Sequence, residues 1–359
     1  SSVWISERLE ALRNHELWPS GALEGRDYFR IKLEDYWDQN INKFEKVIED
    51  IADKRAKLSK DVQVDSFQDC LGPEIEEAEF SKKLDKILEK SLAEIQSKYS
   101  NQPRYSEWVK LAEDFKGPLL EKVLFVQKVG ILISRDEGKS QLDLGFPLGK
   151  PELEYRDNNG VRLASRYFLS TKYDLPYYFG IQDLTRIAFS NIEQFLTFAG
   201  EVFEEILALN VIGEATIVSS SRQDQAMRNA ADNRWKELPK IIPNGHEVCE
   251  FLEKFGFMAR KESQSPNAPY APGVNGIGLK SRFRNDLLHN NKYSKLMSIL
   301  STCVAFNLIK IEENKKQGKK GQTWNIFYLN RWLCLKFGLP LYEGNWRPKK
   351  LDEMKAWLS

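Results

Sequence analysis

Hydrophobic residues recur at helical spacing between residues 293 and 306, and the pattern then changes to the alternation typical of strands. Five of them fall at positions i, i+3, i+4, i+7 and i+8, on one face of a helix: Leu296, Ile299, Leu300, Cys303 and Val304. Apolar and polar side chains alternate over 308–311 and again over 324–328, with turn glycines between them. The segment 293–341 therefore predicts a helix, a hairpin over 308–329 and a closing helix, which we interpret as a winged helix.

The tip of the predicted hairpin gathers four lysines and no acid: Lys315, Lys316, Lys319 and Lys320. Lys292 and Lys295 stand at the start of the preceding helix and are secondary candidates for the same role. Clustered lysine is the electrostatic footprint of a protein that binds a phosphate backbone. Charged side chains at a hairpin tip also keep a loop solvated and discourage edge-to-edge pairing without any ligand, so both interpretations stay open.

Helical periodicity governs most of the chain before residue 210. It predicts helices over 28–58, 74–99, 105–116, 119–134, 161–173 and 181–209, with an irregular stretch rich in Gly, Pro, Asp and Asn at 136–160, and an amphipathic N-terminal piece anchored by Trp4, Leu9 and Leu12. The Ser-rich, weakly periodic residues 211–223 are the best linker candidate. The predicted fold is therefore mainly α, with an all-helical domain 1–215, a winged-helix domain 216–347 with a small β-hairpin, and a C-terminal tail 348–359.

The composition of the chain limits which binding partners are expected. The 359 residues include 53 basic and 52 acidic side chains, so a nucleic acid must be bound by a local patch and not by the overall charge. The four cysteines are far apart, which predicts neither a zinc site nor a disulfide framework and favours a reducing, cytoplasmic location. With no apolar run of about 18 residues, we expect no membrane partner. The start at Ser1-Ser2 suggests a processed, tagged or C-terminal product of something longer.

Residues 164–207 (ASRYFLSTKYDLPYYFGIQDLTRIAFSNIEQFLTFAGEVFEEIL) resemble the lid helices of AAA+ ATPases related to the origin-recognition complex and to bacterial signalling and phage-defence ATPases of the STAND type. SPNAPYAPGVNGIGL and FYLNRWLCLKFGLPL are similar to the winged-helix end of the same proteins. The resemblance covers roughly residues 163–341, about half of the chain. It implies lid-like helices over 163–208, followed by a winged helix.

The chain departs from that family at the residues that would touch a nucleotide. The lid of the family carries an arginine sensor after Gly-Asn-Ile, whereas this chain has Glu193 after Asn191 and Ile192. A carboxylate there would repel a γ-phosphate, and Arg186 nearby cannot be assumed to replace the arginine. The sensor-like positions are therefore Arg186, Asn191 and Glu193.

We find no Walker loop in the sequence. The nearest approach, residues 273–281, has one residue too many between its second glycine and the lysine, and prolines precede it instead of a strand. We expect no cofactor in this chain, with ATP involved only through a missing or partner domain. No catalytic residue or metal ligand is predicted, and whether the parent protein is an enzyme stays open.

Two hypotheses from different classes follow. In the first, the chain is the C-terminal regulatory and nucleic-acid-binding part of an origin-recognition-like ATPase, with defence as the setting that the resemblance suggests. The predicted helix has few Arg, Asn or Gln residues for base recognition, so DNA binding would be mostly sequence-independent. In the second, it is a protein-docking or oligomerisation module that partners a separate ATPase or effector, with Trp324, Trp332 and Trp346 as candidate anchors.

Overall fold

The computed structural model of the chain describes Trp37 and residues 40–138, 146–188, 190–214, 216–265, 273–317, 321–342 and 344–358. The described part is mainly helical, as the sequence predicts, and contains a small four-stranded sheet that includes the predicted hairpin. The predicted N-terminal piece with Trp4, Leu9 and Leu12 lies outside the described residues. None of the described helices is both long and apolar enough to cross a membrane.

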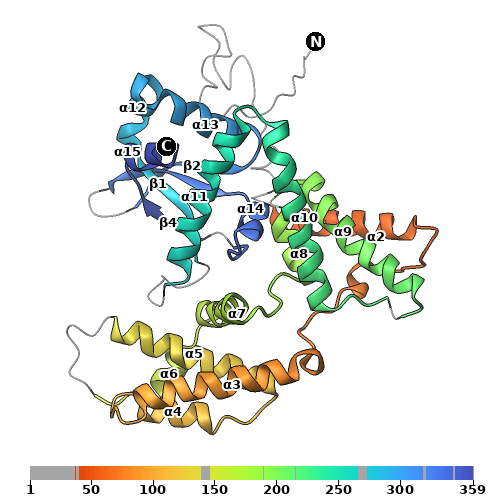
Figure 1. The fold of residues 1–359 in the computed structure, drawn as a ribbon, viewed down its shortest axis with the longest axis vertical. Helices are drawn as coiled ribbons and strands as arrows, with labels where there is room; N and C mark the ends of the chain where they lie inside the picture. The colour runs from red at the N-terminus through yellow and green to blue at the C-terminus, as the bar shows by residue number, and fades with distance from the viewer. Residues whose placement is uncertain are drawn as a thin grey trace.

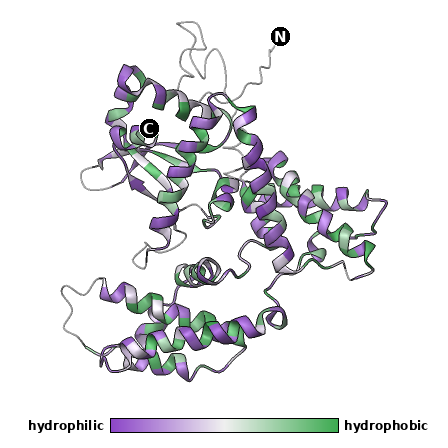
Figure 2. Cartoon of the chain, viewed as in Figure 1, coloured by the Kyte–Doolittle hydropathy of each residue, from purple (hydrophilic) through white to green (hydrophobic). Residues whose placement is uncertain are grey.

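Five helices form a bundle at one end of the molecule (Figure 1): α3 Glu77–Tyr99, α4 Ser106–Glu113, α5 Leu119–Glu137, α6 Lys150–Arg156 and α7 Asn159–Tyr173. They bury two hydrophobic clusters of their own, around Trp108 and around Leu84. Along these helices hydrophobic residues alternate with hydrophilic ones (Figure 2), so each helix turns one face inward. In Figure 1, α7 lies between the other bundle helices and the rest of the molecule.

Helix α6 corrects the prediction of an irregular stretch over 136–160. Its first turn contains Pro151 and follows Gly149, and it buries Leu153. Proline is well suited to the first turn of a helix, because that turn leaves its backbone N–H groups without helical partners. The Gly and Pro content of 136–160 predicts a loop, whereas Gly149 and Pro151 mark the start of a helix.

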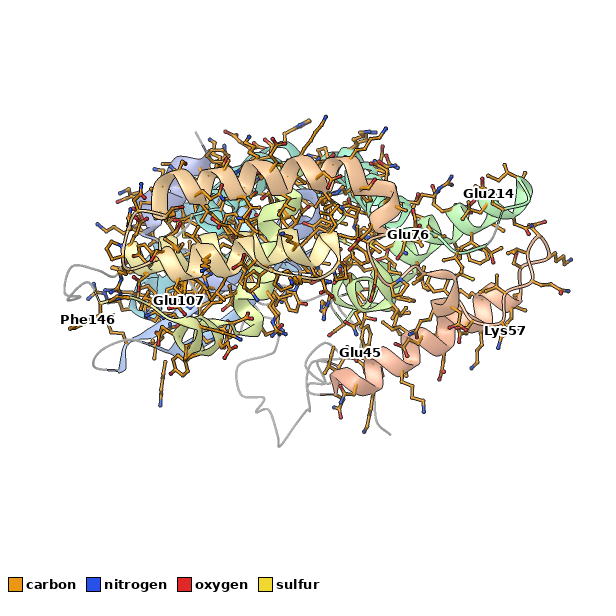
Figure 3. The ribbon with its side chains drawn as sticks, turned by 90° about the horizontal axis from the view of Figure 1, so that it is seen from below. Glu45, Lys57, Glu76, Glu107, Phe146 and Glu214 are labelled. Atoms are coloured by element: carbon orange, nitrogen blue, oxygen red, sulfur yellow. The ribbon has the colours of Figure 1, made fainter. Side chains whose placement is uncertain are left out.

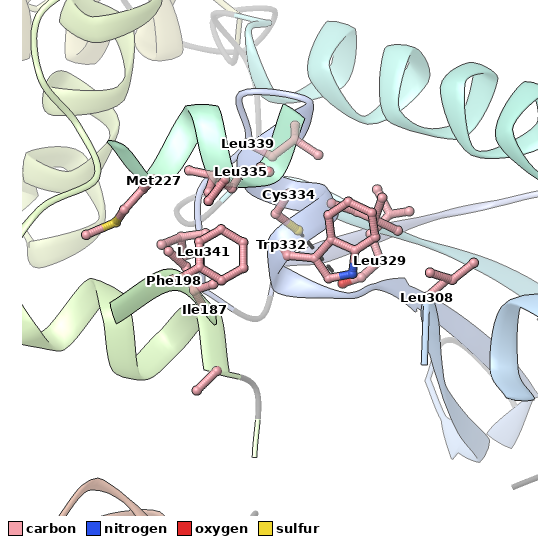
Figure 4. Close-up of a cluster of buried hydrophobic side chains, with 14 of the residues drawn as sticks. Ile187, Phe198, Met227, Leu308, Leu329, Trp332, Cys334, Leu335, Leu339 and Leu341 are labelled. Atoms are coloured by element: carbon pink, nitrogen blue, oxygen red, sulfur yellow. Dashed lines mark hydrogen bonds between the residues drawn. The ribbon is translucent and has the colours of Figure 1, made fainter. Parts of the chain in front are cut away.

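The second body begins with α2 Ile41–Lys57 and continues with α8 Gly180–Ala188, α9 Ile192–Val211 and α10 Ser220–Ile241. Its core also includes residues from the C-terminal part of the chain. Figure 4 shows Phe198 of α9 and Met227 of α10 together with Trp332 and Leu341. The residues on both sides of the predicted linker thus pack into one core, and the domain division at residue 215 stays a prediction.

The remaining elements build the sheet and its cover: α11 Gly245–Ser263, β1 Val274–Lys280, α12 Arg284–His289, α13 Ser294–Ala305, β2 Ile309–Lys316, β3 Thr323–Leu329, α14 Arg331–Lys336, β4 Asn345–Pro348 and α15 Leu351–Lys355. Short 3₁₀ turns occupy Gln68–Cys70, Ser281–Phe283, Asn291–Tyr293 and Ala356–Leu358. The strand order is β2-β3-β1-β4, with β3 antiparallel to β1 and β2. A hairpin of β2 and β3 therefore lies where the alternation of residues 308–329 places one.

Strand β4 was not expected. It pairs parallel to β1, and its Trp346 packs across Gly276 and Gly278. A Cβ atom on either glycine would press against the ring of Tyr328 or Trp346, so these two positions require glycine for close approach. The glycines that resemble part of a phosphate loop in the sequence therefore serve the packing of a sheet.

Candidate functional site

The predicted phosphate contacts on the hairpin are only partly accessible. Lys315 and Lys316 form the end of β2, while Lys319 and Lys320 lie outside the described residues. The ammonium of Lys315 is 2.8 Å from Glu312 Oε2, so this acid of the same strand offsets part of its charge. Lys316 is exposed and lies opposite Thr323. Among the described residues of the hairpin tip, Lys316 is the cation best placed to meet a ligand.

The two lysines at the start of α13 have acidic partners from distant parts of the chain. Lys292 Nζ lies 2.6 Å from Asp352 Oδ1, and Lys295 Nζ lies 4.0 Å from Glu247 Oε1. The hydrogen bond to Asp352 raises the pKa of Lys292, with a further contribution from Tyr293. Both lysines are exposed, so these pairs are weak and can exchange for other anions.

The exposed face of α13 offers little for base recognition. Ser294, Lys295 and Ser298 are exposed on it, and the Oγ of Ser298 accepts a hydrogen bond of 3.3 Å from the Asn244 amide. Serine contacts either purines or pyrimidines and discriminates poorly between bases, whereas arginine, asparagine and glutamine make bidentate contacts. This face therefore suits backbone contacts better than sequence recognition.

The sensor-like positions form structural contacts within the helices. Arg186 of α8 bonds Asp183 through Nη1–Oδ1 at 2.7 Å, and its guanidinium stacks over the ring of Tyr342 at 4.4 Å. Burial raises the pKa of Asp183, although the charge and hydrogen bond of Arg186 act in the opposite direction. Arg186 is thus held against the C-terminal part of the core by its own neighbours.

Asn191 and Glu193 lie at the start of α9. The side chain of Asn191 accepts the backbone N–H of Gln194 at 3.1 Å, which makes it the N-cap of the helix. Glu193 Oε1 lies 3.4 Å from Arg234 Nη1 on α10, and the Arg234 guanidinium stands 5.3 Å from the Trp332 ring. Glu193 therefore bridges α9 and α10.

The sequence resemblance included the Tyr177-Tyr178 motif but not the residues that hold it. The Asp224 carboxylate accepts both backbone N–H groups of the tyrosine pair, at 3.1 and 2.8 Å, and Gln223 accepts that of Gly180 at 2.7 Å. The Tyr178 hydroxyl donates to the Leu339 carbonyl at 2.8 Å. These partners are 43 or more residues away from the motif, and only the fold brings them together.

Gln194 and Asn330 form a second connection that the sequence did not reveal. The buried Gln194 amide donates to Asn330 Oδ1 at 2.8 Å and to the Ile187 carbonyl. Asn330 is fully buried, caps α14 by accepting from Trp332 N, and donates to the Asn307 carbonyl at 2.7 Å. The helices that resemble a lid are therefore tied by buried hydrogen bonds to the element that follows the hairpin.

The residues that resemble part of a Walker loop belong to β1. Residues 276–280 pair with β3 on one side, and residues 274–278 pair with β4 on the other. Their backbone groups face neighbouring strands, whereas a phosphate loop needs free N–H groups at a helix start. Within the described residues no group of three or more His, Cys, Asp or Glu side chains is placed to hold a metal ion, and all four cysteines are free.

Comparison with protein families decides the relationship. A family model described as ORC-CDC6-like matches residues 13–345. The chain belongs to the ORC-CDC6-like family. This relates it to AAA+ ATPases, and the match extends across the α3–α7 bundle, well beyond residues 163–341 on which the sequence resemblance rested. The searches of curated proteins and of solved structures returned no match.

Two groups of residues in this member of the ORC-CDC6-like family bear on its function: the sensor-like residues and the lysines. The sensor-like Arg186, Asn191 and Glu193 are each engaged by protein groups. The described candidate lysines lie between residues 292 and 316: Lys292 in the 3₁₀ turn before α13, Lys295 in α13, and Lys315 and Lys316 in β2. The described lysines therefore carry local positive charge that acidic neighbours partly offset at Lys292, Lys295 and Lys315.

Proposed function

We propose that this member of the ORC-CDC6-like family binds nucleic acid through a winged helix made of α11, β1, α12, α13 and the β2–β3 hairpin. The observation that carries the proposal is the order helix, strand, helix, helix, hairpin, with β1, β3 and β2 in one antiparallel sheet. In helix-turn-helix proteins the second helix enters the major groove, which corresponds here to α13. The hairpin tip would then contact the backbone through Lys315, Lys316, Lys319 and Lys320.

The proposed binding is sequence-independent and serves a regulatory part of an AAA+ assembly. Serines dominate the exposed face of α13, and the available lysines are point charges that attract phosphates without reading bases. ATP would act through a domain or partner outside this chain, as the engaged sensor-like residues suggest. A defence setting remains part of the proposal on the resemblance alone.

The test is fluorescence anisotropy of a labelled 30-base-pair duplex over a salt series. The variant changes Lys315, Lys316, Lys319 and Lys320 to glutamine, and we expect weaker binding and a log-log salt slope flatter by about 0.9 for each lost phosphate contact. A matched control changes four exposed lysines of the bundle to glutamine: Lys82, Lys86, Lys90 and Lys110. Equal losses in both variants, or no binding by the wild type at low salt, would refute the proposal.

A second candidate function, protein docking or self-association, is favoured by an exposed apolar end of the molecule. The Asn210 amide donates to the Asp61 carbonyl at 2.9 Å, which brings the ends of α2 and α9 together. Leu58, Val211 and Ile212 lie there with 79%, 84% and 60% of their surface exposed. Lys57 and Glu214, their sequence neighbours, are labelled at that end in Figure 3. Such a concentration of exposed apolar side chains is typical of interaction sites.

Sedimentation velocity over a range of protein concentrations tests self-association. We expect the Leu58→Ser, Val211→Ser double variant to stay monomeric where the wild type associates. Phe257→Ser is the matched control, because Phe257 is 71% exposed and lies on α11. A wild type that remains monomeric at high concentration would exclude the homo-oligomer and leave docking to a different protein.

A further inference from the structure

The chain that follows the sheet folds back onto the proposed winged helix. Lys349 donates its backbone N–H to the Gly278 carbonyl at 2.9 Å, and Leu351 and Met354 of α15 are buried. Trp357 then packs against the rings of Phe251 and Phe255 of α11, with centroids 5.5 and 6.0 Å apart. These contacts fix the position of α15, so the side chains on its exposed face have a defined place.

Asp352 is one of those side chains, and it reaches the start of α13. Its Oδ1 accepts a hydrogen bond of 3.0 Å from the Tyr293 hydroxyl and lies 2.6 Å from Lys292 Nζ. Tyr293 itself is buried and is the N-cap residue of α13. The hydrogen bonds from Lys292 and Tyr293 lower the pKa of Asp352, so the carboxylate is ionised at neutral pH. One ammonium and one phenol thus bind an anion supplied by the chain itself.

We propose that Asp352 occupies the place of a nucleic-acid phosphate and so competes with the nucleic acid for Lys292 and Tyr293. The inference rests on the proposed function, because it describes how that same surface is regulated. Carboxylate and phosphate oxygens accept the same charge-assisted hydrogen bonds, so a phosphate reaches Lys292 only when Asp352 gives way. Binding at the start of α13 is therefore held back by the C-terminal segment.

The strength of this competition depends on how far the Lys292–Asp352 ion pair is exposed to solvent. The side chains of Lys292 and Asp352 are 50% and 65% exposed. An ion pair that is this exposed to solvent is weak. Asp352 therefore lowers the affinity for nucleic acid without abolishing it. Freeing Lys292 should raise the affinity about two- to fivefold at moderate salt, and one additional phosphate contact should steepen the salt slope by about 0.9.

The experiment compares Asp352→Asn with the wild type in the duplex-binding assay over a salt series. Asp352 is exposed and lies outside the core, so the variant is expected to fold, which thermal unfolding verifies. The matched control is Asp85→Asn, the same substitution at an exposed acid on α3. We expect tighter binding and a steeper slope only for Asp352→Asn. The Lys292→Gln, Asp352→Asn double variant should lose both gains.

The outcomes separate this inference from the proposed function. If the wild type binds and Asp352→Asn binds no more tightly, the competition is refuted while nucleic-acid binding stands. A gain that Asp85→Asn shares, or that survives Lys292→Gln, is a general charge effect and also refutes it. If only Asp352→Asn binds, the proposed function fails for the intact chain, and the competition fails as well, because it lowers the affinity of the wild type without abolishing it. If neither protein binds at low salt, the proposed function fails and the competition fails with it.

Discussion

Asp136 is a buried carboxylate at which several helices of the bundle meet. It lies in the last turn of α5 with its side chain 3% exposed. Its two oxygens accept hydrogen bonds from Arg104 at 2.6 and 3.1 Å, from Arg156 at 2.7 Å and from the Tyr105 hydroxyl at 2.8 Å. The chain before α4, the end of α5 and the end of α6 therefore meet at one carboxylate.

The pKa of Asp136 reflects the hydrogen bonds that hold its carboxylate. Burial alone would raise the pKa, but the hydrogen bonds from Arg104, Arg156 and Tyr105 outweigh it and lower the pKa from 3.8 to about 2. Each pKa unit corresponds to about 1.4 kcal/mol, so the ionised carboxylate stabilises the folded bundle by roughly 2–3 kcal/mol at neutral pH. Because the folded pKa is the lower one, this contribution is complete above pH 3.8 and is lost as the pH falls toward 2.

Asp136→Asn should therefore destabilise the bundle by roughly 2–3 kcal/mol at pH 7, since it removes the carboxylate that Arg104 and Arg156 share, although Arg156 keeps its ion pair with Glu152. Hydrogen exchange of peptides from α5 measures this locally, because the bundle has its own hydrophobic clusters. Asp85→Asn, an exposed acid in the same bundle, is the matched control and should change the exchange by less than about 0.5 kcal/mol.

The pH dependence makes the reasoning refutable. In urea unfolding, the difference between wild type and Asp136→Asn should shrink as the pH falls from about 4 toward 2, because the wild-type carboxylate is then protonated as well. A variant as stable as the Asp85→Asn control at pH 7 would show that solvent screens the carboxylate. A difference that stays constant down to pH 2 would show that its charge is not the cause.

Two further substitutions test the packing around the proposed winged helix. Gly278→Ala should cost about 1–3 kcal/mol in urea unfolding, because its Cβ would overlap the Trp346 ring, whereas Gly200→Ala on an open part of α9 should be neutral or stabilising. Equal effects would contradict the role given to β4. Asn330→Ala should cost about 2–3 kcal/mol, since it removes the cap of α14 and leaves the Gln194 amide with one partner fewer. An unchanged urea midpoint would mean that water replaces the lost hydrogen bonds.

Several elements were readable from the sequence because their information is local. The apolar stripe at Leu296, Ile299 and Leu300 places α13, since a helix that buries one face repeats every 3.6 residues. Residues 308–329 alternate with turn glycines between, which is where β2 and β3 lie. The family relationship could also be inferred from the sequence, because the Tyr177-Tyr178 motif and the motif around Asn191 are each short runs of neighbouring residues.

Elements that depend on distant partners were not readable. Strand β4 has four residues, too few for a periodic signal, and it exists because Trp346 finds Gly276 and Gly278 some 70 residues earlier. The start of α6 could not be predicted, because Gly149 and Pro151 are also typical of loops. Leu153 is buried only because other helices of the bundle pack against it.

The candidate site divides in the same way. The sequence by itself determined that lysines gather near residues 292–320, because charge is a property of each residue. Only the tertiary structure decided which of those charges are available. Asp352 lies 60 residues after Lys292 and Glu247 lies 48 residues before Lys295, yet folding places each acid at its lysine. A charge attracts a ligand only as far as its neighbours leave it uncompensated, and in a folded chain those neighbours are set by packing.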